Sequence, residues 1–311
     1  MKYFIGTLAM TAAFSLSPIA HASPEDEAAI TTIVESVGTL ADRGEFTALE
    51  RLYAPEVMID YSSLSGQPAE IKSPQGLMTE WASVLPGFDR TRHALSSIQT
   101  QINSETATAT AAVAAGHWIN DAYWQVDGQY DYQFAHDGQA WKITSMTFTV
   151  TDEIGSRDVF GPAIEAASKD PSEYILRQQT RAVVMDFLTG LEEKDMAKVN
   201  SVWADDAVQD MPYVPSNFPS RVTGKEALIA QYAAWPEVSG AANFTDHLVF
   251  YPMQDPRTIF VEYRGEVDII PTGETYRQTY GGLFHVDEGK ITLFREYFDP
   301  REFARAFGME Q

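Results

Sequence analysis

Cysteine is absent from this chain of 311 residues. Neither disulfides nor thiol chemistry can therefore contribute, and the folded state has to rest on core packing even in an oxidising compartment. Basic residues are also few, because 22 lysines and arginines stand against 44 aspartates and glutamates, which gives a formal net charge of −22. A field of this sign repels phosphate backbones, so nucleic acid is not expected as a partner.

Long apolar runs are missing beyond the N-terminus. Residues 1–22 begin with Lys2, continue through an apolar run from about Phe4 to Leu16, and end in Ala20-His21-Ala22, which is typical of a signal peptide. The run is too short to span a bilayer, and no later segment has 18 uninterrupted apolar residues. The sequence predicts a secreted or periplasmic protein without membrane insertion. The alternative is an uncleaved N-terminal anchor.

Metal-ligand spacing is missing too, since no motif of spaced histidines and carboxylates occurs. We therefore predict no metal site. The composition that remains, 44% hydrophobic and 12% aromatic, is typical of a globular protein. A chain of this length predicts two domains, each with its own core.

A repeated pattern divides the chain. The stretch 41–61 returns about 150 residues later, so that Ala54 coincides with Ala204 and Asp60 with Asp210. Near the end of each copy, residues 142–144 and 290–292 both read Lys-Ile-Thr, at an offset of 148. Offsets this regular indicate an internal repeat.

Each copy reads as helices followed by strands. Ser23-Pro24 and the stretch from Asp170 to Glu173 are helix starts, and each precedes an apolar stripe of helical spacing. Alternating segments predict strands at 93–101, 106–126, 129–135 and 141–150, and again at 247–252, 257–270, 274–286 and 290–298.

This order predicts an α+β fold of two tandem cone-shaped barrels, each a curved, mostly antiparallel sheet wrapped around N-terminal helices. The expected division is a signal peptide at 1–22, a first domain at 23–152, a linker at 153–169 and a second domain at 170–311. Each cone would enclose an apolar interior suited to a small ligand.

Four features of the first copy belong together: Asp42 at the end of the first helix, the run from Ala54 to Leu64, Thr91-Arg92-His93 and Gly116-His117. In these features the first copy resembles the SnoaL-like, or nuclear transport factor 2-like, superfamily, and within it the scytalone dehydratase type. The resemblance implies a pocket dyad of Asp42 and His93, with Tyr61 holding a water or substrate oxygen. The dehydratase's second pocket tyrosine is replaced by Ala41 here, which argues against scytalone itself as the substrate.

The second copy is similar to the small phenazine-biosynthesis proteins of the same superfamily. The run from Arg295 to Pro300 matches their closing segment. The resemblance implies that His247 is a pocket histidine and Glu296 a pocket acid. Residues of the ketosteroid isomerase oxyanion site are not matched.

The candidate residues fit an elimination without a cofactor. A histidine near neutral pKa, held by a carboxylate, can take a proton from carbon and return it to a leaving group. Asp42 and His93 would form this pair, and His117 would be a second acid-base group. Alternation places His117 on the apolar side of its strand, with Ala109 to Ala115 at the same parity.

Each assignment has a structural alternative. On pattern alone, His117 is equally a core histidine, and Asp42 is a solvated acid unless the helix ends beside it. Glu296 shares its parity with Phe294 and Phe298, which predicts a buried carboxylate with a raised pKa; the alternative is an ion pair with Arg295 or Arg264.

Three functions follow in order of preference. The first is a dehydratase-type lyase that acts on a small apolar molecule, cyclic or polyketide-like. The second is a non-catalytic carrier or sensor with two apolar pockets, because one fold serves many functions. The third is an oligomerisation module, in which sheet faces pair within the chain or between copies.

Cleavage after Ala22 predicts a mature chain that begins at Ser23. Intact-mass measurement of the protein exported by a bacterial host checks this prediction. Exported protein that still carries residues 1–22 would contradict it.

Overall fold

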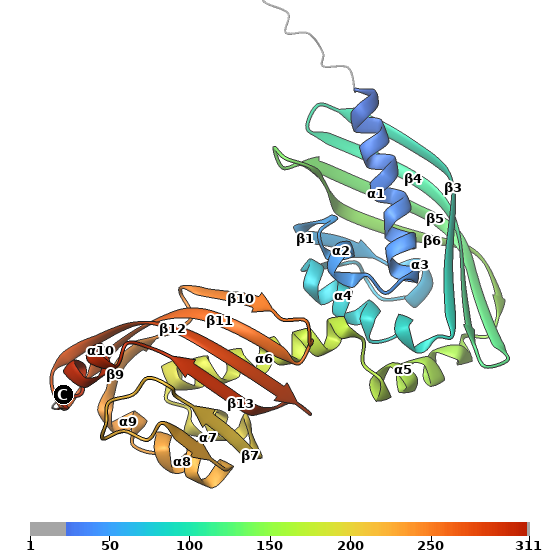
Figure 1. Cartoon of the computed structure of the whole chain (residues 1–311). Coiled ribbons are helices and arrows are strands. Elements are labelled where there is room, and N and C mark those ends of the chain that lie inside the picture. Colours follow the sequence, from blue (N-terminus) through green and yellow to red (C-terminus); the bar gives the residue numbers. More distant parts are fainter. Residues whose placement is uncertain (1–22, 310–311) are drawn as a thin grey trace, which may run out of the picture. The chain divides into compact units, whose positions relative to one another are not determined.

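A computed structural model describes residues 23–309, and the predicted signal peptide lies outside them. The chain separates into two compact units, here called the first and second domains. Of the described residues, the first contains 23–78 and 89–159, and the second contains 79–88 and 160–309. Figure 1 labels the elements of both.

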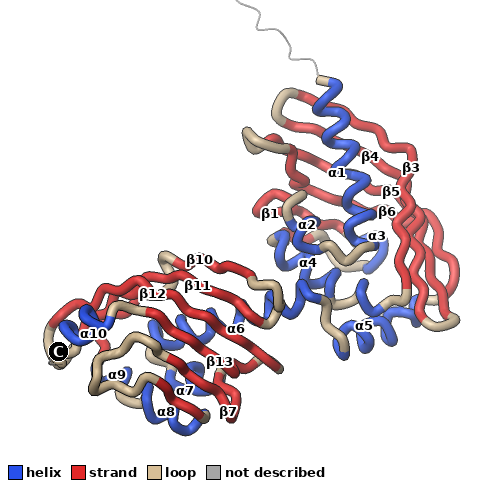
Figure 2. Tube along the Cα trace, in the orientation of Figure 1, coloured by secondary structure: helices blue, strands red, loops and turns tan. Residues whose placement is uncertain are grey.

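The first part of the chain places helices before four long strands (Figure 2). The elements are α1 (Pro24–Asp42), α2 (Phe46–Glu50), β1 (Tyr53–Asp60), α3 (Ser62–Ser65), β2 (Glu70–Lys72), α4 (Pro74–Ala82), η1 (Leu85–Gly87), β3 (Arg90–Asn103), β4 (Thr106–Ile119), β5 (Ala122–His136), β6 (Trp141–Gly155) and η2 (Arg157–Val159). The sheet order is β2-β1-β6-β5-β4-β3, antiparallel except for the β1–β6 pair.

The second part repeats this plan. Its elements are α5 (Phe160–Lys169), α6 (Glu173–Glu193), α7 (Met196–Ser201), β7 (Trp203–Asp210), β8 (Arg221–Thr223), α8 (Lys225–Tyr232), α9 (Trp235–Val238), β9 (Ser239–Asn243), β10 (Leu248–Pro252), β11 (Thr258–Ile269), β12 (Glu274–Asp287), β13 (Lys290–Tyr297) and α10 (Pro300–Ala306). The sheet order is β10-β11-β12-β13-β7-β8, with β9 also paired to β11 and only β7–β13 parallel.

The α+β class is therefore confirmed, and so is the repeat. β1 and β7 are eight residues long and lie 150 residues apart, and each pairs in parallel with the last strand of its sheet. Both sheets are open, with β2 and β3 at the edges of the first, and the structure is consistent with the two predicted tandem cone folds, whose sheets do not close. The segment 153–169, predicted as a linker, holds the end of β6, η2 and α5.

One predicted strand, 106–126, is in fact two. β4 ends at Ile119 and β5 begins at Ala122, with a tight turn between them. Asn120 takes the left-handed conformation there (φ 51°), which asparagine tolerates, and its N–H donates to the Asp89 carboxylate at 2.6 Å.

Gly128, expected in a turn, lies inside β5 at a shift in the β5–β6 register. A Cβ there would lie 2.4 Å from the Thr149 carbonyl oxygen, so this bulge requires glycine.

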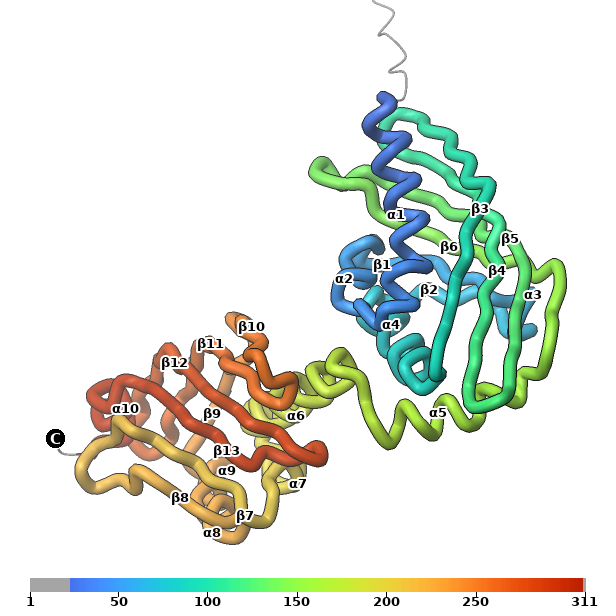
Figure 3. Tube along the Cα trace, turned by 45° about the vertical axis from the view of Figure 1, so that its right-hand side comes forward, coloured from blue at the N-terminus to red at the C-terminus, as the bar shows by residue number. Residues whose placement is uncertain are grey.

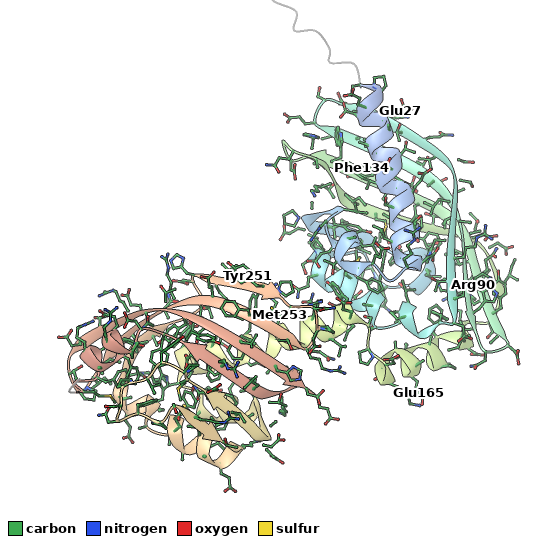
Figure 4. The ribbon with its side chains drawn as sticks, in the orientation of Figure 1. Glu27, Arg90, Phe134, Glu165, Tyr251 and Met253 are labelled. Carbon is green, nitrogen blue, oxygen red and sulfur yellow. The ribbon has the colours of Figure 1, made fainter. Side chains whose placement is uncertain are left out.

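Helix α1 crosses one face of the first sheet, as Figures 1 and 3 agree. Ser23 caps its N-terminus by accepting a hydrogen bond from the Asp26 N–H, as predicted. Ile30, Val34 and Val37 are buried, and Phe134, labelled on β5 in Figure 4, is also buried. The Trp141 indole donates to Asp26 at 2.9 Å, which ties the start of α1 to β6.

Gly38 controls how closely α1 approaches β3. A Cβ at this position would lie 2.6 Å from Leu95 Cδ1 and 2.9 Å from His93 Cβ. Glycine inside a helix ordinarily costs about 1 kcal/mol relative to alanine. At this position the absence of a side chain permits the contact between helix and strand.

We expect Gly38→Ala to lower the free energy of unfolding by about 1–3 kcal/mol, because overpacking outweighs the gain in helix propensity. Thr39→Ala, on the exposed side of the same helix, is the matched control and should change it by less than about 0.5 kcal/mol. Urea unfolding of the whole chain measures both. Equal or higher stability of Gly38→Ala would show that the contact is not tight.

Candidate active site

Asp42 closes α1 and faces the start of β3. Its Oδ1 lies 2.7 Å from His93 Nδ1 and accepts the Thr91 hydroxyl at 2.8 Å, while its Oδ2 accepts the His93 backbone N–H at 2.8 Å. The helix ends at this residue, which is the condition under which the sequence allowed the side chain to turn inward. The structure thus brings Asp42 and His93 together, and their side chains are 22% and 13% exposed.

The charge of Asp42 sets the tautomer of His93. Burial alone would raise the pKa of Asp42, but hydrogen bonds from the His93 side chain and backbone and from Thr91 outweigh it, so the pKa lies below its ordinary value. An ionised carboxylate only accepts hydrogen bonds, so Nδ1 of His93 carries the proton. Nε2 of the neutral ring is left as the basic nitrogen, which is the form that a general base requires.

His117 lies on β4 beside this pair. Its ring centroid is 5.6 Å from that of His93, edge to face, and Thr91 is its partner across the β3–β4 ladder. The residue is 5% exposed, so the burial predicted from alternation is confirmed. Burial, reinforced by the nearby His93, lowers the pKa of His117 to about 4. At neutral pH the ring is therefore uncharged and acts as a hydrogen-bonding group rather than as an imidazolium acid.

Trp124, which the sequence reasoning missed, covers His117 from β5. The ring centroids are 5.1 Å apart, and the two residues are directly paired in the β4–β5 ladder. The indole N–H donates to Glu153 at 2.9 Å. Arg157 and Trp124 lower the pKa of Glu153 to about 2, and Arg157 also donates to the Leu64 carbonyl. The pairing of Trp124 with His117 could have been read from the sequence only if the turn at 120–121 had been recognised, whereas the sequence predicted a single strand over 106–126.

Tyr61 belongs to a cluster of tyrosines in the first domain. It follows β1, its ring packs edge to face on Phe148 at 6.2 Å, and it hydrogen-bonds to Tyr130. Burial and the neighbouring tyrosines raise its pKa well above the ordinary value, so the hydroxyl is a proton-bearing donor. These contacts place Tyr61 beside Tyr130 and Tyr132. Asp60 instead accepts the Ser62 N–H at 2.9 Å.

The hydroxyl of Tyr132 is buried and has no hydrogen-bond partner among the described residues. Tyr130, Tyr132 and Phe134 share one parity on β5 and are all buried, with adjacent rings 5.6 and 6.0 Å apart. That alternation was readable in the sequence as an aromatic face, although it carried no indication of chemistry.

The second domain contains a cavity of about 220 Å³ with a carboxylate in its wall. Glu296 accepts the Tyr263 hydroxyl at 3.0 Å and the Gln209 amide at 3.1 Å. Burial raises the pKa of Glu296 to about 7, although these two hydrogen bonds act in the opposite direction. Phe294 and Phe298 are buried at the same parity, as predicted, whereas Arg295 pairs with Asp210 at 2.8 Å. The predicted alternative, an ion pair between Glu296 and Arg295, is therefore wrong.

His247 lies apart from this cavity. The long edge strand β3 of the first domain is replaced in the second by β9 and β10, and the break at 244–247 contains His247 in an exposed turn. It lines an outer groove with Asp246 and Arg264. The expected pocket histidine is thus not brought to Glu296, because the break in the strand removes it from the interior face.

Gln209 was also missed by the sequence reasoning. It is 1% exposed and directly precedes Asp210 on β7, so its side chain lies on the opposite face of the strand. A glutamine at a core parity is the signal that would have identified it.

Residues 23–309 contain no group of three or more His, Cys, Asp or Glu side chains arranged to hold a metal ion. Within the same range, no helix is both long enough and apolar enough to cross a membrane.

Comparison with known proteins places both halves of the chain in one family. SnoaL-like domain families match residues 22–147 and residues 184–294. YesE, an uncharacterised protein of Bacillus subtilis, is 32% identical over 122 residues, which are 39% of this chain and 82% of YesE. A PhzA/B-like protein of Pseudomonas aeruginosa is 26% identical over 128 residues, 41% of this chain and 89% of its own.

A scytalone dehydratase-like protein of Novosphingobium aromaticivorans has a similar structure, with 15% identity, a TM-score of 0.39, and coverage of 43% of this chain and 89% of its own. YesE and the PhzA/B-like protein each match about two fifths of this chain and most of their own length, which corresponds to one domain. The chain therefore belongs to the SnoaL-like family of the nuclear transport factor 2-like superfamily and carries two of its domains in tandem.

Proposed function

We propose that the chain is a secreted lyase whose first domain eliminates water, or another small leaving group, from a compact apolar substrate, cyclic or polyketide-like, without a cofactor. The observation that carries this proposal is the hydrogen bond of 2.7 Å between Asp42 and His93 Nδ1. It leaves Nε2 of a neutral imidazole as a base beside a second histidine. The superfamily resemblance of the first copy supports the same reading.

The elimination needs one proton to move twice. His93 Nε2 takes a proton from the carbon next to a substrate carbonyl, and Asp42 stabilises the imidazolium that forms. The electrons of the broken C–H bond form a C=C bond as the C–O bond to the leaving group breaks. The imidazolium then returns the proton to the departing hydroxide, which leaves as water.

His117 and Tyr61 have lesser parts in this scheme. His117 is neutral at pH 7, so it stabilises the leaving group or the substrate carbonyl by hydrogen bonding and does not act as a positively charged acid. Tyr61 bears its proton at every physiological pH and can donate to a substrate oxygen only if it releases Tyr130. The base itself is therefore His93 alone.

A screen of the mature protein against hydroxylated aromatic and terpenoid ketones, with mass detection of the loss of one water, tests the proposal. Turnover of one class of substrate would support a lyase. Binding without turnover across the set would favour the alternative, a carrier with two apolar pockets.

His93→Gln should reduce kcat by about 10²–10⁴-fold, because the amide cannot take a proton from carbon and return it to the leaving group. His136→Gln, in the same domain beside a hairpin turn, is the control and should leave kcat unchanged. Substrate affinity, measured separately by calorimetry, should be retained in both variants. Unchanged turnover by His93→Gln would rule out the dyad.

The low pKa of His117 predicts a pH-dependent stability. Between about pH 6.5 and pH 4 the unfolded chain binds a proton that the folded ring refuses, so stability falls as the pH falls through this range. The full effect is roughly 3 kcal/mol. Ring-proton NMR titration measures the pKa directly, with His117→Asn used to assign the signal. A pKa near 6.5 would contradict the buried, neutral role.

The Trp124 cover should maintain that low pKa. Glu153→Ala removes the acceptor of the indole N–H, so we expect the pKa of His117 to rise toward its ordinary value as water reaches the ring. Glu165→Ala, which removes an exposed ion pair with Lys169, is the matched control and should not change the titration. The same His117 titration in Glu153→Ala as in the wild type would show that Trp124 holds its position without Glu153.

A further inference from the structure

Glu296 is a carboxylate inside an apolar cavity with no cation beside it. The described lining of the cavity contains no lysine, arginine or histidine, and Arg295, its neighbour in sequence, pairs with Asp210. Buried charges in proteins are normally paired, because an uncompensated charge in an apolar setting is costly. The described lining of this cavity therefore offers Glu296 no countercharge.

The hydrogen bonds around Glu296 are oriented for an ionised carboxylate. Gln231 Nε2 and the Tyr232 hydroxyl both donate to the Gln209 carbonyl oxygen, at 2.7 and 3.1 Å. The Gln209 amide group therefore turns its N–H toward Glu296 Oε2, and the Tyr263 hydroxyl donates to Oε1. Each carboxylate oxygen keeps a further lone pair for a ligand.

Aromatic rings form a large part of the wall, together with aliphatic side chains. Tyr232, Trp235, Phe244, Tyr263 and Tyr280 line the cavity with Glu296. Tyr263 and Tyr280 are stacked with centroids 4.7 Å apart, and the Phe244 centroid lies 6.4 Å from that of Tyr263 and 6.3 Å from that of Tyr280. The faces of such rings attract cations, and recognition of quaternary ammonium groups by aromatic cages is a common use of this attraction.

We propose that the second domain binds a small organic cation, a quaternary ammonium or protonated amine with apolar substituents, whose charge lies between Glu296 and the aromatic rings. An inorganic cation fits poorly because the lining offers a single carboxylate, while the Gln209 carbonyl is already used. An anion is excluded by Glu296 itself and by the net charge of −22. This inference is independent of the proposed lyase activity of the first domain.

The proposal predicts a pH dependence of a definite sign. The titratable groups facing Glu296 are Tyr232 from α8, Tyr263 from β11, and Tyr276 and Tyr280 from β12. Burial raises the pKa of each of these tyrosines, so they stay neutral, and Glu296, with a pKa of about 7, is the group that titrates. A cation should bind more tightly as the pH rises through 7, whereas a ligand that accepts a proton from Glu296 should bind more tightly as the pH falls.

Choline and its neutral isostere 3,3-dimethylbutan-1-ol are the probes, titrated into the whole chain by calorimetry at pH 6 and pH 8. We expect choline to bind at least about tenfold more tightly than the alcohol at pH 8 and to weaken at pH 6. Glu296→Gln should remove most of this preference and leave the alcohol unaffected. Glu262→Gln, an exposed glutamate on β11, is the control and should behave as the wild type.

Three results would overturn the proposal: equal affinity for the two probes, choline binding that strengthens at pH 6, or no binding of choline at either pH. The pH series on the wild type keeps the test valid even if Glu296→Gln unfolds. None of these outcomes bears on the first domain, whose turnover is measured with separate substrates.

Discussion

A carboxylate at the C-terminal end of a helix determines the geometry of the first domain. That end of a helix carries partial negative charge, so an acid there is disfavoured unless donors offset it. Asp42 receives three: the His93 ring, the His93 backbone N–H and the Thr91 hydroxyl. The same bonds fix the start of β3 against α1 and select the tautomer of His93. The packing of α1 on β3 and the tautomer of His93 thus depend on the same two carboxylate oxygens of Asp42. Gly38 allows the close approach of helix and strand that brings these oxygens within hydrogen-bond distance of His93.

The second domain retains the packing function of this acid without the chemistry. Glu192, 150 residues after Asp42, lies at the end of α6 and accepts hydrogen bonds from the backbone N–H groups of Phe244 and Thr245 and from the Thr245 hydroxyl. A link from the helix end is therefore common to both copies, to the start of β3 in the first and to the break between β9 and β10 in the second, and no imidazole takes part in the second link. A carboxylate at this place is a structural feature of the repeat, and the histidine that joins it in the first copy is what makes a base.

The sequence predicted the parts of this protein that depend on local pattern and repetition. Alternation identified the buried face of β4 and therefore His117, and the offset of 150 identified the repeat that places β1 and β7 at equivalent positions. The sequence-based prediction failed at Asn120, where a turn lies inside an apolar run. It failed again at 244–247, where a break in the strand moves His247 away from the expected pocket. Contacts such as those of Trp124 with His117, or of Gln209 with Glu296, join strands by register, and register becomes readable only when every turn between the strands is known.

The two polar sites occupy different places in the same frame because each core accepts only a few buried polar groups. His117 corresponds, at the offset of 150, to the buried Val267, and Glu296 corresponds, at the offset of 148 that aligns the closing strands, to the buried Phe148. Each copy thus has an apolar side chain at the position where the other carries its titrating group.

Burying a polar group costs free energy unless hydrogen-bond partners satisfy it. Each of these groups has its own set of neighbours: Asp42, Thr91 and Trp124 around the histidines, and Gln209 and Tyr263 around the carboxylate. A second polar site in either domain would need a second set of such partners from a core that is otherwise aromatic and aliphatic. Duplication resolves this conflict, since one fold presents an imidazole beside Asp42 in one copy and a carboxylate in a cavity wall in the other.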